Sequence, residues 1–374
     1  MKEIDFTIII GIIAAFISLL LAVFIFSVAS KNKISNQLFA TFLVLNAIEF
    51  SGWFSSLFFD APNNFLVAKS LLSYLQIPLL YVYILSVCYS DFKLKWNHLW
   101  HIAPYIFVNF MMIPRFYLAD TNQKTKMYAH YNELYEIIFL HISLHLQSII
   151  YITAGFIVLH KAKKIFVENY SSNTIETYKW LFQLLLFTAT LYFVAIIKNV
   201  FKYLGQKDGF EMAQIVLIII VLCVVCWYVL KALRYPNLFS GVDSKTKLTT
   251  EILKENEKTQ INKEEIKQLT SYMETEKPYL NPSLTIRNLS EKIKMNSRDV
   301  SVLINQHLNQ HFFDFVNEYR IKEAMKILKD PAKKEFTVLE VLYEVGYNSK
   351  SSFNTAFKKN TGYTPTQFKK KALL

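Results

Sequence analysis

Long hydrophobic runs separated by short polar loops make up the first 231 residues of the chain. Each run is close to the ~20 residues that a helix needs to cross the hydrocarbon core of a bilayer. Pro104 and Pro114 interrupt the fourth run, and the flank before the first run is not basic, unlike that of a signal peptide. The pattern predicts seven retained membrane-spanning helices, near residues 8–30, 37–58, 65–89, 97–117, 134–160, 179–203 and 211–231.

The pattern changes after residue 231. Pro236 and Gly241 stop the last apolar helix, because proline cannot continue it and glycine permits a turn. Residues 232–277 are charged, with apolar positions loosely spaced at helical intervals, and predict a partly helical linker. A solvated connecting helix and a dimerising coil both fit that spacing. Residues 278–374 then predict a small helical domain.

Charge is distributed as unevenly as hydrophobicity. The 374 residues are 53% hydrophobic and include 31 Phe and 22 Tyr, which is typical of a chain that meets lipid. Residues 1–240 hold 18 Lys/Arg and 12 Asp/Glu, whereas residues 241–374 hold 23 and 17. The final 26 residues contain six Lys and no acidic residue. Clustered cations of this kind fit a solvated face and also fit contacts to the phosphates of a duplex, which we favour.

The loops predict the orientation of the spans. Ten Lys/Arg flank the odd-numbered loops and the exit of the seventh span, against six on the opposite side. Because cytoplasmic loops carry the basic excess, the N-terminus is expected outside and the C-terminal domain in the cytoplasm. The predicted location is the bacterial inner (cytoplasmic) membrane. The ten are Lys31, Lys33, Lys93, Lys95, Lys161, Lys163, Lys164, Lys179, Lys231 and Arg234; the six are Lys2, Arg115, Lys124, Lys126, Lys202 and Lys207.

Four polar residues within the spans are candidates for intramembrane ligand sensing: Glu49, Gln76, His141 and His145. Polar groups in a membrane are costly and therefore indicate function. His141 and His145 share one helix face, so metal ligation, inter-helical hydrogen bonding and a polar ligand cavity are all open. The glutamate of the HExxH protease motif is absent between them. Gln76 precedes Pro78, which predicts a kink there.

Catalytic motifs are absent from the sequence. It contains no glycine-rich phosphate loop, kinase signature or nucleophile elbow. Cys88, Cys223 and Cys226 all fall inside apolar runs, and the single Cys-x2-Cys pair has no second pair with which to form a zinc site. We predict no enzymatic activity, no cofactor and no metal site.

The C-terminal domain carries two patterns of a support helix, a turn and a second helix. In the first, the spacing of Val300, Leu303 and Ile304 predicts an inward apolar face. In the second, Gly346 ends the support helix, Asn348 or Ser349 caps the next helix, and Phe353, Ala356 and Phe357 face inward. The outward, candidate DNA-binding residues are Arg298, Ser301, Val302, Asn305, Lys350, Ser351, Asn354, Thr355 and Lys358.

The ordered signature Gly346-Tyr347, Phe353, Phe357-Lys358, Gly362 and Pro365 resembles the second helix-turn-helix of AraC/XylS-type transcription regulators. The resemblance covers about residues 261–372. It implies roughly seven helices, with two recognition helices that enter adjacent major grooves on one face of the DNA. The matching base-contact positions are Arg298, Ser301, Val302, Lys350, Ser351 and Thr355. Val302 and Thr355 stand where family members often have arginine. Membrane-attached relatives with a multi-span N-terminal half have a similar arrangement.

The predicted fold class is all-α: a seven-helix transmembrane bundle followed by a cytoplasmic tandem helix-turn-helix domain. The leading functional hypothesis is a membrane-bound one-component transcription regulator that binds specific double-stranded DNA under control of a signal sensed by the spans. Its expected partners are DNA, the lipid bilayer, an unknown small-molecule or membrane signal and RNA polymerase, with a homodimer left open. The alternative is a seven-helix transporter or channel with a cytoplasmic regulatory tail.

Overall fold

The structure is a computed structural model that describes residues 5–27, 33–61, 63–89, 92–130, 133–169, 174–234 and 263–372. The chain forms two compact units, an N-terminal helical bundle and a C-terminal helical unit. Every secondary-structure element in the described ranges is helical. The all-α prediction is therefore confirmed for this part of the chain.

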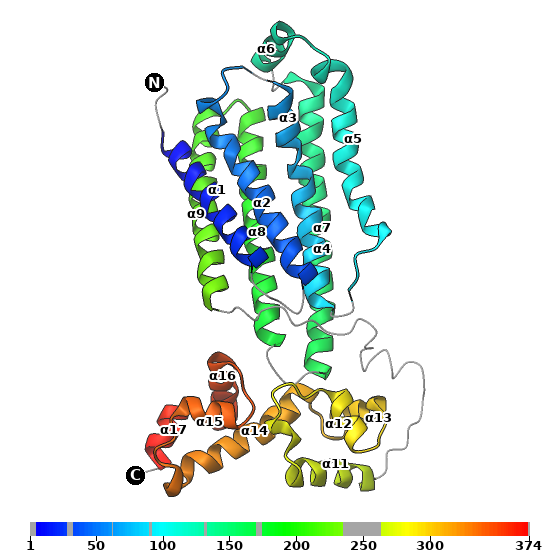
Figure 1. Ribbon diagram of the computed structural model, residues 1–374, viewed down its shortest axis with the longest axis vertical. Coiled ribbons are helices and arrows are strands. Elements are labelled where there is room, and N and C mark those ends of the chain that lie inside the picture. Colours follow the sequence, from blue (N-terminus) through cyan, green and yellow to red (C-terminus); the bar gives the residue numbers. More distant parts are fainter. Residues whose placement is uncertain are drawn as a thin grey trace. The chain divides into compact units, whose positions relative to one another are not determined.

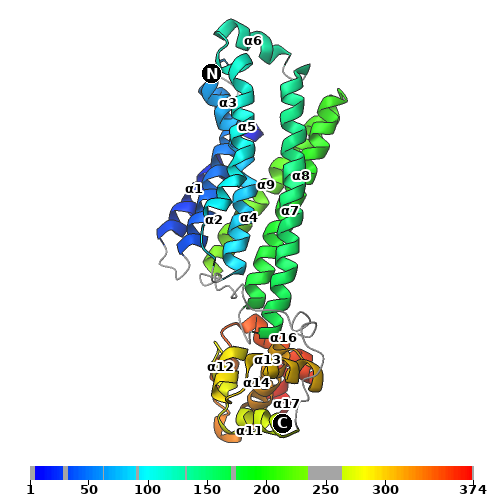
Figure 2. The same cartoon turned by 90° about the vertical axis from the view of Figure 1, so that its right-hand side faces the viewer.

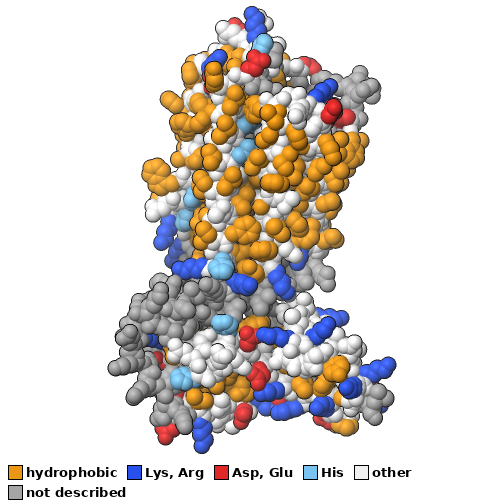
Figure 3. Space-filling model, turned by 180° about the vertical axis from the view of Figure 1, so that it is seen from behind, with side chains coloured by type: hydrophobic (Ala, Val, Ile, Leu, Met, Phe, Trp, Pro, Cys, Tyr) orange, Lys and Arg blue, Asp and Glu red, His pale blue; other side chains and the backbone are white. Residues whose placement is uncertain are grey.

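The N-terminal bundle consists of long helices that run roughly alongside one another (Figures 1 and 2). Six of them are long and apolar enough to cross a membrane, and a bent pair raises the number to seven if it counts as one span. Their outward side chains are large and apolar; Phe16, Phe110 and Leu230 are each exposed by more than 60%. Figure 3 shows hydrophobic side chains over most of the visible face of the bundle, as lipid contact requires. The bundle helices are α1 (Phe6–Ser27), α2 (Lys33–Phe50), α3 (Asn64–Leu71), α4 (Ser73–Cys88), α5 (Ala103–Met112), α6 (Thr121–Ala129), α7 (Tyr135–Asn169), α8 (Thr174–Tyr203) and α9 (Lys207–Arg234).

The bent pair corresponds to the predicted fourth span. Pro104 lies in the first turn of α5. Backbone N–H groups in this turn have no acceptor within the helix, so a proline there removes no helical hydrogen bond. Pro114 lies in a π-helical turn, Ile113–Tyr117, that follows α5. The helical segment Trp96–Tyr117 then bends by 112° into the segment that contains α6. The second proline therefore marks the region of the break, while the first is accommodated.

Pro78 lies inside α4, and the helix continues through it. The boundary between α3 and α4 falls earlier, at Leu72, and the kink predicted at Pro78 stays a prediction. Pro78 has no N–H to offer to the carbonyl of Tyr74, one turn back. The side-chain amide of Gln147 on α7 donates to that carbonyl instead, at 3.0 Å. A side chain from another helix thus satisfies the backbone group that the proline frees.

The C-terminal unit has two groups of short helices, with one long helix running between them (Figure 1). The long helix is α14. Its cap residue Asp330 precedes Pro331, which ends the helix. The helices of the unit are α11 (Lys263–Thr275), α12 (Ile286–Lys292), α13 (Ser297–Val302), α14 (Phe312–Lys329), α15 (Val338–Glu344), α16 (Lys350–Thr361) and α17 (Pro365–Ala372).

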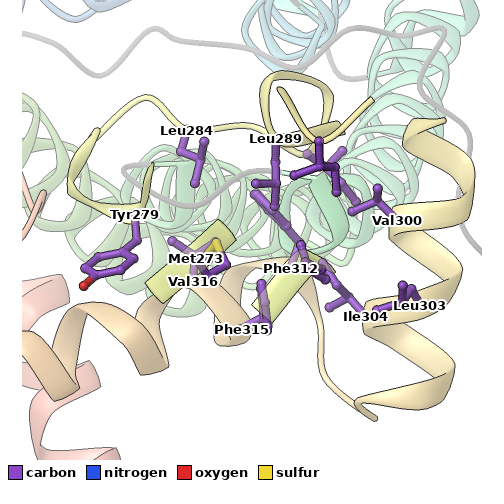
Figure 4. Packing of buried hydrophobic residues seen from close by; sticks show 13 residues of the cluster. Met273, Tyr279, Leu284, Leu289, Val300, Leu303, Ile304, Phe312, Phe315 and Val316 are labelled. Carbon is purple, nitrogen blue, oxygen red and sulfur yellow. The ribbon is translucent and has the colours of Figure 1, made fainter. Parts of the chain in front are cut away.

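Helix α11 packs into the core of the first group. Leu269 and Met273 are fully buried in one cluster with Leu289 and Phe312 (Figure 4). The sequence pattern assigns these α11 positions to a linker that ends at residue 277. Among the described residues, α11 instead packs as part of the C-terminal unit, because its apolar positions form one stripe that needs a partner surface. The remainder of the predicted linker, residues 235–262, lies outside the described residues.

Candidate functional site

The second helix-turn-helix has the local geometry that the sequence predicts. Thr337 and Glu340 form a reciprocal capping box at the start of α15. Gly346 follows the helix at φ +81°, in the left-handed region that favours glycine. Ser349, and not Asn348, caps α16 by accepting a hydrogen bond from the N–H of Ser352 at 3.3 Å.

Helix α16 separates an apolar face from a polar face. Phe353 and Phe357 are fully buried in the cluster that joins α14, α15 and α17. Of the five predicted outward residues of this helix, four are exposed and one, Asn354, is half-buried. The four exposed residues are Lys350, Ser351, Thr355 and Lys358. The outward placement is therefore confirmed, and contact of these residues with DNA stays a prediction.

The lysines around α16 differ in how the protein engages them. Lys359 pairs with Asp314 at 2.8 Å, and the ammonium of Lys369 donates to the carbonyl of Phe336 at 2.7 Å. The ammonium groups of Lys350 and Lys358 form no hydrogen bond or ion pair with any described residue. Their ammonium groups are therefore available to neutralise phosphates.

The first helix-turn-helix departs from the prediction. Its second helix, α13, ends at Val302 and continues as a π-helical turn, Leu303–His307, so the 3.6-residue spacing does not hold through to Leu308. Ser301 and Val302 are both only 4% exposed. The expectation that these two lie on an open outward face is wrong in this structure.

The contacts of Asn305 explain part of this burial. Its side-chain amide donates to the carbonyl of Ser301 at 2.9 Å and lies 3.4 Å from the Ser301 hydroxyl. The Asn305 side-chain oxygen lies 3.0 Å from Nδ1 of His311. Arg298 is half-buried, and Asn296 caps the helix below it. Arg298 therefore remains the better-placed candidate for DNA contact in this unit.

Arg320 is a functional candidate that the sequence reasoning missed. Its side chain is fully buried in α14. It donates to the carbonyl of Tyr279 at 2.7 Å and to that of Asn281 at 2.8 Å, and its guanidinium lies 5.4 Å from the ring centroid of Tyr347. Burial lowers the pKa of Arg320 to about 10, so the group stays charged at neutral pH. Its position on the same helical stripe as Val316 and Ala324 is the signal that predicts inward orientation.

Gly346 meets the same segment. A Cβ at this position would lie 2.6 Å from the carbonyl oxygen of Leu280 and 2.7 Å from that of Tyr279. The turn of the second helix-turn-helix thus packs directly on residues 279–281, which lead into the first. Arg320, Gly346 and Tyr347 form an inter-motif joint that fixes the two motifs relative to each other.

The N-terminal bundle contains a cavity of about 330 Å³. All four polar residues predicted for ligand sensing line it: Glu49 from α2, Gln76 from α4, and His141 and His145 from α7. They lie far apart in the sequence. The structure brings them together at one cavity, which the sequence did not predict, and ligand binding by these residues stays a prediction.

Residues of α8, which the sequence reasoning did not select, complete the polar lining. Lys198 and Asn199 both line the cavity. The Asn199 side-chain nitrogen lies 2.8 Å from Nε2 of His145. Because an amide nitrogen only donates, Nε2 accepts and Nδ1 carries the ring hydrogen. Nδ1 of His145 is buried without a partner among the described residues.

Metal ligation has no support in the described ranges. They contain no group of three or more His, Cys, Asp or Glu side chains arranged to hold an ion. Cys88 is buried at the end of α4, and Cys223 and Cys226 are exposed on α9, all three as free thiols. The side chain of Asn199 contacts His145, one of the two histidines considered as metal ligands. This contact is a hydrogen bond.

Comparisons with known proteins concern the C-terminal unit. Residues 289–371 match a family model described as a helix-turn-helix domain. The C-terminal unit contains an AraC-type helix-turn-helix domain. A solved structure of the C-terminal domain of AraT, a response regulator from Geobacillus stearothermophilus, is similar over 30% of this chain and 88% of that chain, with 23% identity and a TM-score of 0.26.

Three curated relatives each match a part of the chain. An HTH-type transcriptional regulator in the cgkA 5′ region of Pseudoalteromonas carrageenovora is 51% identical over 53 residues, which are 14% of this chain. The Bacillus subtilis proteins YesN, a transcriptional regulatory protein, and YdeC, an HTH-type transcriptional regulator, are 30% and 29% identical over 24% and 23% of this chain. The matches span 29%, 25% and 29% of these three relatives. They support a role in DNA-binding transcription regulation.

Proposed function

We propose that this protein is a membrane-bound transcription regulator that binds specific DNA through its helix-turn-helix domain and senses a signal through its helical bundle. The observation that carries the proposal is the exposed face of α16, with Lys350 and Lys358 available above a fully buried aromatic core. The same chain carries six or seven helices that are apolar enough to span a membrane. Tethering a DNA-binding domain to such a bundle couples a membrane event to a promoter.

Signal transfer requires two states with different ligand affinity. The cavity with its four polar residues is the proposed sensing site. Helix α11, which follows the segment after the bundle, packs into the core of the first helix-turn-helix. A change at this helix would reach the inter-motif joint through residues 279–281, and so alter the spacing of the two recognition helices. RNA polymerase and a second copy of the chain are proposed partners of the DNA-bound form.

The proposal is tested on the full chain in lipid nanodiscs with a library of random duplexes. We expect selective enrichment of a sequence motif and an affinity that falls steeply with salt, because phosphate contacts release counterions. Failure of a monodisperse, folded protein to retain any duplex at low salt would contradict the proposal. In that case the transporter or channel alternative, tested by flux through the reconstituted bundle, takes its place.

A further inference from the structure

The lining of the bundle cavity carries one charge of each sign among the described residues. Glu49 is the one carboxylate that lines it and Lys198 the one ammonium. The two charges act on each other electrostatically, and Lys69 acts on Glu49 from outside the lining. Lys202 also lies outside the lining and acts on Lys198. A charge in a weakly polar environment is costly unless an opposite charge compensates it.

Neither Lys198 nor Lys69 forms an ion pair within 4 Å with a carboxylate of the described residues. Lys198 has no carboxylate within 4 Å among the described residues, and its ammonium lies 5.9 Å from the ring centroid of Phe210. Lys69 donates to the hydroxyl of Ser51 at 3.1 Å, and this neutral acceptor does not compensate the charge of the ammonium. The lining therefore offers a cation to an incoming group.

A second donor lies on the same wall. Nδ1 of His145 carries a hydrogen and is buried without a described partner, because Asn199 occupies the other ring nitrogen. A buried donor without an acceptor is destabilising, and a ligand oxygen would satisfy it. Lys198 acts electrostatically on His145, and both side chains line the cavity.

The remainder of the lining is apolar. Apolar side chains from four helices line the cavity: Leu71 of α3, Ile77 of α4, Leu140 and Leu144 of α7, and Val221 and Val225 of α9. This combination of a few convergent polar groups with an apolar wall is typical of small-molecule sites, and about 330 Å³ falls within their usual size.

We infer that the cavity binds a small amphiphile with one anionic head group and an apolar body. The head group contacts the Lys198 ammonium and the Nδ1–H of His145, and the body packs on the leucine and valine wall. This identity of the ligand deepens the proposed function, on which its regulatory meaning rests. The binding itself does not depend on DNA. A soluble carboxylate and an anionic lipid share this chemistry.

The test uses three probes of nearly equal shape: 4-phenylbutyrate, 4-phenylbutylamine and 4-phenylbutan-1-ol. Each is titrated calorimetrically into the full chain in nanodiscs of zwitterionic lipid. We expect the acid to bind about tenfold or more tightly than the amine and the alcohol. Lys198→Met should weaken binding of the acid roughly thirtyfold, and Glu49→Gln should strengthen it by removing like-charge repulsion. Lys207→Met, at the exposed start of α9, is the matched control and should change nothing.

A parallel titration in nanodiscs that contain phosphatidylglycerol separates the two sources. A Lys198-dependent loss of apparent acid affinity there identifies an anionic lipid as the competing occupant, and unchanged affinity identifies a soluble anion. Equal or tighter binding of the amine, retention of acid binding by folded Lys198→Met, or no binding of any probe at about millimolar concentration would overturn the inference. Acid binding that leaves DNA affinity unchanged contradicts the regulatory coupling alone.

Discussion

Arg320 shows how one side chain determines the geometry of the whole C-terminal unit. A fully buried guanidinium is costly to desolvate and is tolerated where its donors are satisfied. Here two donors reach backbone carbonyls of residues 279 and 281, and its face lies over the ring of Tyr347. Each motif thus contributes to the environment of a charge that neither could bury alone.

Loss of this group should destabilise the inter-motif joint. Arg320→Met keeps the stem and removes the donors, which leaves the buried carbonyl of Tyr279 without this partner at about 1–3 kcal/mol, while the carbonyl of Asn281 keeps the N–H of Leu284 at 3.2 Å. Since all five tryptophans lie before residue 228, tryptophan fluorescence does not report on this unit. Hydrogen exchange of α14 and α16 in the full chain measures the local free energy of opening. Arg287→Met, on an exposed side chain, is the control, and equal protection in the two variants would refute the role.

Two glycines with similar backbone angles offer a sharper comparison. Gly346 and Gly362 lie at φ +81° and +77°, so alanine costs about 1–2 kcal/mol at either position from the backbone alone. Gly346→Ala also places a Cβ 2.6 Å from a carbonyl oxygen, whereas nothing lies within 4 Å at Gly362. Hydrogen exchange of α15 and α16 should therefore show a clearly larger loss for Gly346→Ala. Equal losses would contradict the close packing at the joint.

At the scale of elements, predictability followed the regularity of each helix. Helix α16 keeps its 3.6-residue spacing between Ser349 and Gly362, and its exposed face was predictable from the sequence. Helix α13 gives way to a π-turn after six residues, and the same reasoning misplaced Ser301 and Val302. Polarity alone also failed at α11, where a charged sequence hides a stripe that packs against α12 and α14.

Lysines of α16 should divide by role. Lys350→Ala should reduce discrimination between bases, by about 1–3 kcal/mol if a good base contact is lost. Lys358→Ala should weaken binding to all DNA sequences and reduce the slope of log affinity against log salt concentration by about one. Lys322→Ala is the control, because that ammonium is already paired with Glu318 at 2.6 Å. Affinities of the full chain for selected and random duplexes across a salt series measure this. Identical effects of Lys350→Ala on both duplexes would remove its assignment to base readout.

At the scale of the whole molecule, the sequence predicted which residues are apolar enough to span a membrane but not how the spans pack. The four polar positions were identifiable because charge and amide groups are rare in such runs. Lys198 was not selected from the sequence, because its place in the cavity depends on the packing of α8 against α2 and α7, which periodicity does not encode.

The proposed orientation has its own test. In a variant with all three cysteines replaced by serine, a membrane-impermeant maleimide should label Lys126→Cys in intact cells. Lys95→Cys, in the loop before the bent span, should react after permeabilisation alone. The expectation follows from the excess of basic residues in cytoplasmic loops. The reverse labelling pattern would place the DNA-binding domain outside the cell and would exclude the proposed function.

The central claim is that a membrane-tethered chain occupies specific chromosomal sites through its recognition helices. Genome-wide occupancy of the full-length protein in its native cell tests this most directly, with the Arg298→Ala/Lys350→Ala double variant as control. We expect discrete sites that share a sequence motif and that the double variant loses while still present in the membrane fraction. Occupancy that is absent or uniform along the chromosome, or sites that the folded double variant retains unchanged, would contradict the account.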